Sequence, residues 1–320
     1  MENSLVNAQQ AIEKIITNIE KVMVGKRQAV ELAVIALISQ GHLLIEDVPG
    51  VGKTMLARSL ARSINCGFKR IQFTPDMLPG DITGVTVYNQ KINDFEFRPG
   101  PIIAQVVLAD EINRATPKVQ SALLEAMEEK QISLDGITHK MPSPFHVLAT
   151  QSPIEYEGTF PLPEAQMDRF LLRISIGYPS PEEEIAIINR QQYVHPIEQI
   201  GHVVDTCDVL NLQETAKKIY VDDLIKQYIV SLVAATRHHP AIGIGASPRG
   251  SLALFRTAQA RALLQGRDYV LPDDVKALAE SALAHRTMLS PAAQSQDKGG
   301  RAYIAEILET VPIPGAIPKH

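Results

Sequence analysis

Residues 42–54 read HLLIEDVPGVGKT, and this stretch decides the fold. The short apolar run His42 to Glu46 is followed by a glycine-rich loop, and Lys53 to Ile64 then has the pattern of a helix. A strand, a Gly-x-Gly-Lys-Thr loop and a helix in this order are the context of a phosphate-binding loop. The alternative is a glycine-rich turn that binds no ligand. Such a turn would not require a strand before it and a helix after it, and both patterns are present here. The spacing therefore predicts an α/β fold built around a nucleotide-binding turn.

Each residue type in this loop has a chemical purpose. Glycines let backbone N–H groups curl around phosphate oxygens, and the start of the next helix adds partial positive charge. We expect Lys53 to reach the β- and γ-phosphates of ATP, and the Thr54 hydroxyl to bind Mg²⁺. The general pattern places glycine six residues before the lysine, where this chain has Asp47. The expected nucleotide-binding residues are Pro49, Gly50, Val51, Gly52, Lys53, Thr54 and Met55.

A second polar pair follows a buried strand. The run Gln105 to Ala109 is continuously apolar and ends in Asp110-Glu111. In a doubly wound parallel sheet, the loops after the strands open at one edge, where ligands bind. We therefore expect Asp110 to hold Mg²⁺ through water and Glu111 to polarise the attacking water. Without a phosphate-binding loop upstream, such a pair would be interpreted as a solvated strand end.

Strand and helix patterns alternate over the first half of the chain, which indicates a doubly wound parallel sheet covered on both faces. Asp81 to Pro101 and Gln131 to Pro144 carry turn signals and are predicted to be hairpin insertions. After Tyr178 the strand pattern fades. The expected domains are an α/β nucleotide-binding domain with two N-terminal helices, residues 1–178, and a smaller all-helical lid, residues 179–320. Helices of the lid are predicted at 182–192, 222–237, 247–265 and 272–285.

The composition excludes several classes of protein. The 320 residues are 45% hydrophobic and 21% charged, which is not the composition of a disordered chain. The longest apolar stretch is too short to span a membrane, and the N-terminus lacks the pattern of a signal peptide. The two cysteines fit no zinc or disulfide framework, which is usual in a reducing compartment, so we expect a cytoplasmic protein. The short apolar stretches predict no membrane insertion. The net charge of −5 argues against constitutive binding of nucleic acid.

These segments together resemble the AAA+ ATPases and, within them, the MoxR family. The resemblance is carried by GHLLIEDVPGVGKT (41–54), QFTPD (72–76), FRPGP (97–101), ADEINRA (109–115), LPEAQMDRF (162–170) and GASPR (245–249). The segments occur in the order of the family and cover nearly the whole chain. Asp47 is usual in this family, and the two predicted hairpins fall where the family carries its helix-2 insertion and its insertion before the first sensor.

The resemblance implies roles for residues outside the phosphate-binding loop. Arg169 matches the arginine finger, which reaches the γ-phosphate of a neighbouring subunit, and Arg249 matches the second sensor. Ser152 stands where the family usually has the asparagine of the first sensor. A serine hydroxyl is shorter and has fewer donors than an asparagine carboxamide, so either hydrolysis is slowed or a water or Gln151 fills the gap. Arg114 is implied to contact an adjoining subunit.

The resemblance also implies an assembly and a role. ATP and Mg²⁺ would bind between the α/β domain and the lid, and hydrolysis would occur at the interfaces of a homo-oligomeric, hexameric ring. Such proteins have a chaperone-like role in maturing or activating partner proteins, often ones with a von Willebrand factor A domain.

The residues leave other interpretations open. Ser152 keeps open the alternative of a nucleotide-gated binding module with little hydrolysis. The acidic net charge and the lack of a Lys/Arg run in the predicted hairpins count against a nucleic-acid motor. The simpler interpretation of Arg249 is an arginine at a helix start that pairs with an acidic neighbour.

Overall fold

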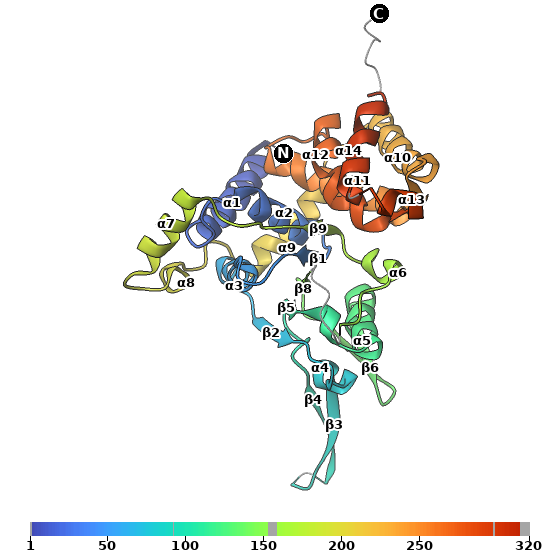
Figure 1. Ribbon diagram of the computed structural model, residues 1–320. Coiled ribbons are helices and arrows are strands. Elements are labelled where there is room, and N and C mark those ends of the chain that lie inside the picture. Colours follow the sequence, from blue (N-terminus) through green and yellow to red (C-terminus); the bar gives the residue numbers. More distant parts are fainter. Residues whose placement is uncertain (1, 92, 153–158, 297, 314–320) are drawn as a thin grey trace, which may run out of the picture.

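A five-stranded parallel sheet forms the centre of the protein, with the strand order β2-β5-β8-β1-β9 (Figure 1). The computed structural model describes residues 2–91, 93–152, 159–296 and 298–313. The strands are β1 (Leu43–Glu46), β2 (Phe68–Gln72), β5 (Val106–Asp110), β8 (His146–Gln151) and β9 (Leu172–Ile174). The predicted α/β fold with a parallel sheet is confirmed.

The sheet is buried on both faces. Along β1, Leu43 and Ile45 belong to one hydrophobic core and Leu44 belongs to the other. Every residue of β5 and of β8 is buried. Successive side chains of a strand point to opposite faces, so a strand that is covered on both sides must be apolar throughout. This requirement explains the unbroken apolar run before Asp110.

Helices from both ends of the chain cover one face of the sheet. The core on this face contains residues of α1 (Glu2–Glu20), α2 (Arg27–Ile38), α3 (Lys53–Ser63), α9 (Thr206–Lys217), α10 (Asp223–His238), α11 (Pro248–Leu264) and α12 (Pro272–Leu283). The N-terminal helices therefore pack together with lid helices in one continuous core. The other face is covered by α4 (Pro79–Thr83) and α5 (Pro117–Glu129).

Both predicted hairpins are present. The first consists of β3 (Gly84–Asn89) and β4 (Asp94–Pro99) and extends far from the sheet (Figure 1). The second consists of β6 (Gln131–Leu134) and β7 (Ile137–Lys140). Its turn residues Asp135 and Gly136 both have positive φ, 50° and 79°, as the tight hairpin turn predicted by Asp-Gly requires. One boundary is wrong, because residues 81–83 end helix α4 and are not part of a strand.

The lid is helical, as predicted, and it contains further elements that were not predicted. Besides α9 to α12 it contains α7 (Pro181–Gln191), α8 (Pro196–Gln199), η2 (Ala284–Arg286), α13 (Pro291–Gln294) and α14 (Gly300–Thr310). The strands β10 (Ile242–Ile244) and β11 (Met288–Leu289) form a small antiparallel pair that the sequence analysis did not predict. The domain boundary near residue 178 stays a prediction. Among the described helices, none combines the length and apolar character needed to cross a bilayer.

Candidate active site

The loop after β1 is shaped to hold an anion. Gly50 and Gly52 have φ of +91° and +98°, a left-handed backbone that glycine adopts readily. A Cβ placed on Gly50 would meet no atom within 4 Å, so the loop is open at this point. Helix α3 begins at Lys53, directly after the loop. The first N–H groups of this helix have no partner within the helix and are therefore available to phosphate oxygens.

The Lys53 side chain folds back onto the start of this loop. Its Nζ is 2.5 Å from the backbone oxygen of Asp47, which accepts its hydrogen bond. Burial lowers the pKa of Lys53, while the charges of Asp47, Asp110 and Glu111 oppose this shift. The acidic pair after β5 is thus close enough to influence the lysine. A phosphate oxygen would be a stronger acceptor than the carbonyl, because a hydrogen bond between two charged groups is the stronger kind.

Asp47 fastens the loop to the end of β9. Its Oδ2 accepts hydrogen bonds from the backbone N–H groups of Ile176 and Gly177, at 2.7 and 2.8 Å, and from the Ser175 hydroxyl at 2.9 Å. Its Oδ1 accepts from the N–H of Val48 at 2.9 Å. Burial opposes the charge, but these hydrogen bonds outweigh it and lower the pKa of Asp47. The glycine of the general pattern could make none of these bonds.

We expect Asp47→Asn to lower the free energy of unfolding at pH 7 by about 1–3 kcal/mol, because buried donors lose a charged acceptor. The pKa of Asp47 is lower in the folded chain than in the unfolded one. Its carboxylate therefore stabilises the fold above the unfolded pKa of about 4, and this stabilisation is lost as the pH falls through the folded pKa. Urea unfolding from pH 7 down to about pH 3 measures the effect. A wild-type advantage that stays constant over this range would contradict the prediction.

Asp110, at the end of β5, is held from both neighbouring strands. Thr150 of β8 donates its hydroxyl to Oδ1 over 2.6 Å. Arg70 of β2 donates to Oδ2 from Nε at 3.0 Å and from Nη2 at 2.7 Å. Since β2 and β8 flank β5 in the sheet, the strand order itself supplies these two partners. The carboxylate is thus oriented before any ligand arrives.

The residues at this edge of the sheet fit Mg²⁺ that is bound together with a nucleotide. Thr54 and Asp110 offer oxygen donors, which this ion prefers, and it takes its other ligands from water and phosphate. Within the described ranges, no group of three or more His, Cys, Asp or Glu side chains could hold a metal ion. A site in which Asp110 is the one carboxylate ligand suits a Mg²⁺ ion that the nucleotide itself helps to hold. The assignment of the Mg²⁺ ligands to Thr54 and Asp110 stays a prediction.

Glu111 has a strained backbone and a constrained carboxylate. Its φ of 59° and ψ of 50° lie in the left-handed region, which is costly for a residue with a side chain. The N–H of Glu111 donates to Thr150 Oγ1 over 2.9 Å, so Thr150 holds the Asp110 carboxylate and the backbone of Glu111 together. Gln72 Nε2 and Arg114 Nη1 each donate to Glu111 Oε2 over 2.9 Å. Arg114 therefore pairs with Glu111 of its own chain in this structure.

The region of the first sensor lies at the same edge. Ser152 directly follows β8, beside the ends of β1 and β5. Gln151, one of the alternatives for filling the gap left by the missing asparagine, donates from Nε2 to Glu46 Oε1 over 2.8 Å. Pro153, which belongs to the family motif, lies outside the described residues. The role of Ser152 in hydrolysis stays a prediction.

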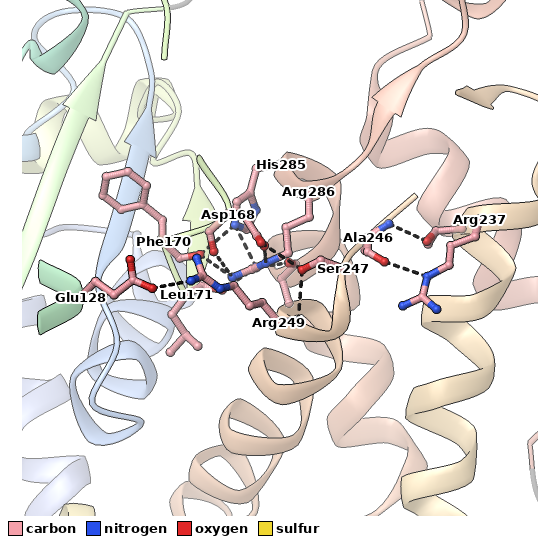
Figure 2. Close-up of polar contacts among 12 residues, drawn as sticks. Glu128, Asp168, Phe170, Leu171, Arg237, Ala246, Ser247, Arg249, His285 and Arg286 are labelled. Atoms are coloured by element: carbon pink, nitrogen blue, oxygen red, sulfur yellow. Dashed lines mark hydrogen bonds and ion pairs between the residues drawn. The ribbon is translucent and has the colours of Figure 1, made fainter. Parts of the chain in front are cut away.

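Arg169 and Arg249 lie together, but at the other edge of the sheet. Arg169 precedes β9, and Arg249 is in the first turn of α11. Both pair with Glu128 at the end of α5. Arg169 Nη1 is 3.1 Å from Glu128 Oε2. Arg249 Nη2 donates to Glu128 Oε1 (Figure 2). Arg249 thus has an acidic partner, as its simpler interpretation expected, but Glu128 is 121 residues away in the sequence.

A buried ion pair fixes the lid at this edge (Figure 2). Arg286 of η2 donates from Nε to Asp168 Oδ1 over 2.8 Å, and from Nη2 to the backbone oxygen of Phe170 over 2.6 Å. The hydroxyl of Ser247, which caps α11, donates to Asp168 Oδ2 over 2.9 Å. Burial lowers the pKa of Arg286 to about 10 despite the opposing effect of Asp168, so the guanidinium stays charged at neutral pH. Arg249 is therefore held next to Arg169.

The phosphate-binding loop and the two arginines do not meet within one chain. Lys53 follows the end of β1, whereas Arg169 precedes the start of the parallel neighbour β9. β1 has four residues, and a strand of that length spans about 13 Å. Within one chain Arg249 therefore does not lie beside the phosphate-binding loop, and its role as the second sensor stays a prediction. Its guanidinium lies at the edge where the strands begin.

Several residues of the site were missed by the sequence analysis. Arg70 and Gln72 are two residues apart on β2, so they share a face of the strand, and two polar residues on one face were a usable signal. Thr150 carried no such signal, because its two contacts depend on the strand order. Glu128 was also not identifiable, because its partners Arg169 and Arg249 are distant in the sequence and Arg249 reaches it only when the lid docks.

The comparisons with known proteins agree with the fold. A model of the "ATPase family associated with various cellular activities (AAA)" matches residues 42–172, and an AAA lid domain model matches residues 234–307. The uncharacterized protein YeaC of Bacillus subtilis (strain 168) is 54% identical over 301 residues, 94% of each chain. Chaperone MoxR1 of Mycobacterium tuberculosis is 45% identical over 97% of this chain and 84% of its own. The crystal structure of a candidate ATPase from Cytophaga hutchinsonii has a TM-score of 0.92 at 39% identity, covering 98% of this chain and 97% of its own.

Proposed function

This chain belongs to the MoxR family of AAA+ ATPases, and we propose that it hydrolyses ATP at sites shared between its own copies. The observation that carries this proposal is the separation of the two halves of the site. Lys53, Asp110 and Glu111 lie where the strands end, and Arg169 and Arg249 lie where they begin. Two copies arranged head to tail bring these halves together, which one chain does not.

One copy supplies the nucleotide half of the site. The N–H groups of the loop and the Lys53 ammonium bind the β- and γ-phosphates. Mg²⁺, when it is bound through Thr54 and Asp110, would offset charge on these phosphates. Glu111 polarises the attacking water and accepts its proton. Thr150 and Arg70 hold Asp110, and Gln72 and Arg114 hold the carboxylate of Glu111, until the nucleotide arrives.

The next copy supplies the arginine half. Arg169 and Arg249 both act in trans, because Glu128 holds them on the same surface. A γ-phosphate carries more charge than one carboxylate, so it can draw both guanidinium groups from Glu128. Charge that develops on the γ-phosphoryl group in the transition state is then met by fixed cations, an effect worth roughly 10³–10⁵ in rate for an arginine finger.

The wider role follows from relatives and resemblance. A relative with 45% identity is named Chaperone MoxR1, which supports a chaperone-like role that couples ATP hydrolysis to the maturation or activation of client proteins. We further propose a hexameric ring, clients with a von Willebrand factor A domain, and a cytoplasmic location. Turnover stimulated by DNA would instead indicate a nucleic-acid motor. Absence of turnover in a single-turnover assay on the assembled protein would indicate a nucleotide-gated binding module.

Lys53→Ala tests the binding half of the proposal. Loss of a charged donor aimed at phosphate should weaken the Kd for Mg²⁺-ATP by about 10- to 100-fold, the equivalent of 1.5–3 kcal/mol for a hydrogen bond to a charged group. Calorimetric titration with Mg²⁺-ATP measures this change. Lys14→Ala, which removes an exposed lysine from α1, is the matched control and should bind like the wild type. An unchanged Kd for Lys53→Ala would overturn the assignment of the loop.

A further inference from the structure

Helix α7 carries an exposed apolar and acidic face next to the phosphate-binding loop. Ile185 and Ile188 are three residues apart and therefore share one side of the helix, where they are 60% and 65% exposed. Glu184, four residues before Ile188, is exposed on the flank of this side. Isoleucine side chains this exposed, with a carboxylate beside them, are typical of a surface that another molecule covers.

The position of α7 is fixed relative to the loop. Lys26 Nζ donates to the backbone oxygen of Tyr178 over 2.8 Å and lies 3.7 Å from Glu183 Oε2 in the first turn of α7. Asp47 of the loop binds the N–H of Gly177 at 2.8 Å. The helix therefore starts beside the site that holds the phosphates. A copy whose arginines reach these phosphates must also come close to α7.

A groove of about 640 Å³ lies at the opposite edge of the sheet, between α5, α9 and α11. Its lining includes Arg249, Leu252 and Arg256, which follow one another on α11 at spacings of three and four residues and so share one face of the helix. Leu252 is 53% exposed, and the partly buried Phe255 lies beside it on α11. The surface that presents Arg249 to a neighbour thus continues into an apolar and basic stripe.

The groove carries excess positive charge. Its acidic members, Glu128 and Asp168, are already paired with arginines. Lys130, Lys217 and Arg256 also line it, and Lys217 pairs with the exposed Glu214 at 2.6 Å. In the part of the chain that the structure describes, neither Lys130 nor Arg256 has a carboxylate within ion-pair distance. Burial lowers the pKa of Lys130, and the charges of Arg256 and Lys217 lower it further.

We propose that α7 of one copy docks into this groove of the next copy. Ile185 and Ile188 pack against Leu252 and Phe255, and Glu184 faces the basic side chains of the groove. This inference rests on the proposed function, because the contact that brings Arg249 to a neighbouring nucleotide also turns the rest of its helix face toward that neighbour. The complementary charges fix the register of the two copies and speed their encounter.

Cysteine cross-linking tests the contact directly. The double variant Ile188→Cys, Leu252→Cys is made in a Cys207→Ser background, because Cys207 is exposed. Oxidation with Mg²⁺-ATP present should give a ladder of covalent oligomers on a non-reducing gel, since each copy has one partner on each side. The two single variants are the controls for the remaining Cys66. Cross-links no more abundant than in the single variants would overturn the inference.

Charge exchange gives a second test that does not depend on cysteine chemistry. Glu184→Lys and Arg256→Glu should each raise the protein concentration for half-assembly by about 5-fold, as measured by mass photometry, and the two together should restore it. Lys118→Glu, an exposed site on α5, is the control and should assemble like the wild type. Wild-type assembly of both charge variants would show that something other than α7 occupies the groove.

The docking of α7 and the proposed ATP hydrolysis can be disproved by different results. If Arg169→Ala is added to the cysteine pair, hydrolysis should be lost while the ladder persists, because Arg169, which also lines the groove, faces the neighbouring γ-phosphate in the assembly and does not pack against Ile185 or Ile188. A ladder without any hydrolysis in the cysteine pair that retains Arg169 would leave the docking standing and overturn the proposed function. Hydrolysis shared between copies without a ladder would overturn the docking alone.

Discussion

Arg169→Ala should lower the rate of ATP hydrolysis by about 10³-fold or more while leaving the Kd for ATP nearly unchanged. The guanidinium matters most where charge develops in the transition state, so its loss affects turnover far more than binding. Within its own chain Arg169 contacts Glu128 and lies at the edge of the sheet away from the loop, so its removal leaves the nucleotide half intact. Steady-state phosphate release and calorimetry measure the two quantities.

A matched control and the conservative variant sharpen this result. Arg58→Ala removes an exposed arginine from α3 and should keep wild-type turnover. Arg169→Lys retains the charge but lacks the planar fork of donors, so it should recover only part of the activity. Full activity of Arg169→Ala at concentrations where the protein assembles would remove the arginine from the mechanism.

Glu111→Gln should lower turnover by about 10²-fold or more, the scale of general-base catalysis, and still bind Mg²⁺-ATP. The glutamine has a similar size, and its carbonyl oxygen can still accept hydrogen bonds from Gln72 and Arg114, which now hold Glu111 Oε2 at 2.9 Å. What is lost is the carboxylate that polarises the water. The variant should therefore retain uncleaved ATP.

Turnover and the bound nucleotide recovered after gel filtration measure both parts of this prediction. Glu309→Gln, an exposed site on α14, controls for the loss of one negative charge. Wild-type turnover in Glu111→Gln would show that another group activates the water. Loss of ATP binding would instead indicate that Glu111 has a structural role at the loop.

The central fold was predictable because its signals are local. Three segments are each determined by a few neighbouring residues: the phosphate-binding loop, the apolar run before Asp110 and the Asp135-Gly136 turn. The loop between strand and helix, the buried strand and the hairpin turn were all predicted at the correct positions. Helix α9 was missed because its buried face includes a polar residue, Gln213, which donates to the backbone oxygen of Leu37 over 2.9 Å. Helix α14 was missed because Gly299 and Gly300, at its start, are weak helix signals.

The site was predictable only in part, because some of its contacts join residues that are distant in the sequence. Lys53 and Asp110 are recognisable from short segments, whereas the contacts of Thr150 depend on which strands are neighbours in the sheet. The place of Arg249 depends on where the lid docks, and that docking rests on a buried pair between residues 118 positions apart, Asp168 and Arg286. No local pattern contains this information. The sequence therefore did not indicate at which edge of the sheet Arg249 lies.

Mixing the two inactive variants tests most directly whether the site is shared between copies. Subunits with Arg169→Ala keep Glu111, and subunits with Glu111→Gln keep Arg169. In a mixed assembly, some interfaces combine an intact Glu111 with an intact Arg169 from the next copy, so activity should return in part and rise with protein concentration. A labelled-subunit assay establishes that the subunits exchange. Activity that stays at the level of the separate variants, at every ratio and concentration and with exchange demonstrated, would contradict a shared site.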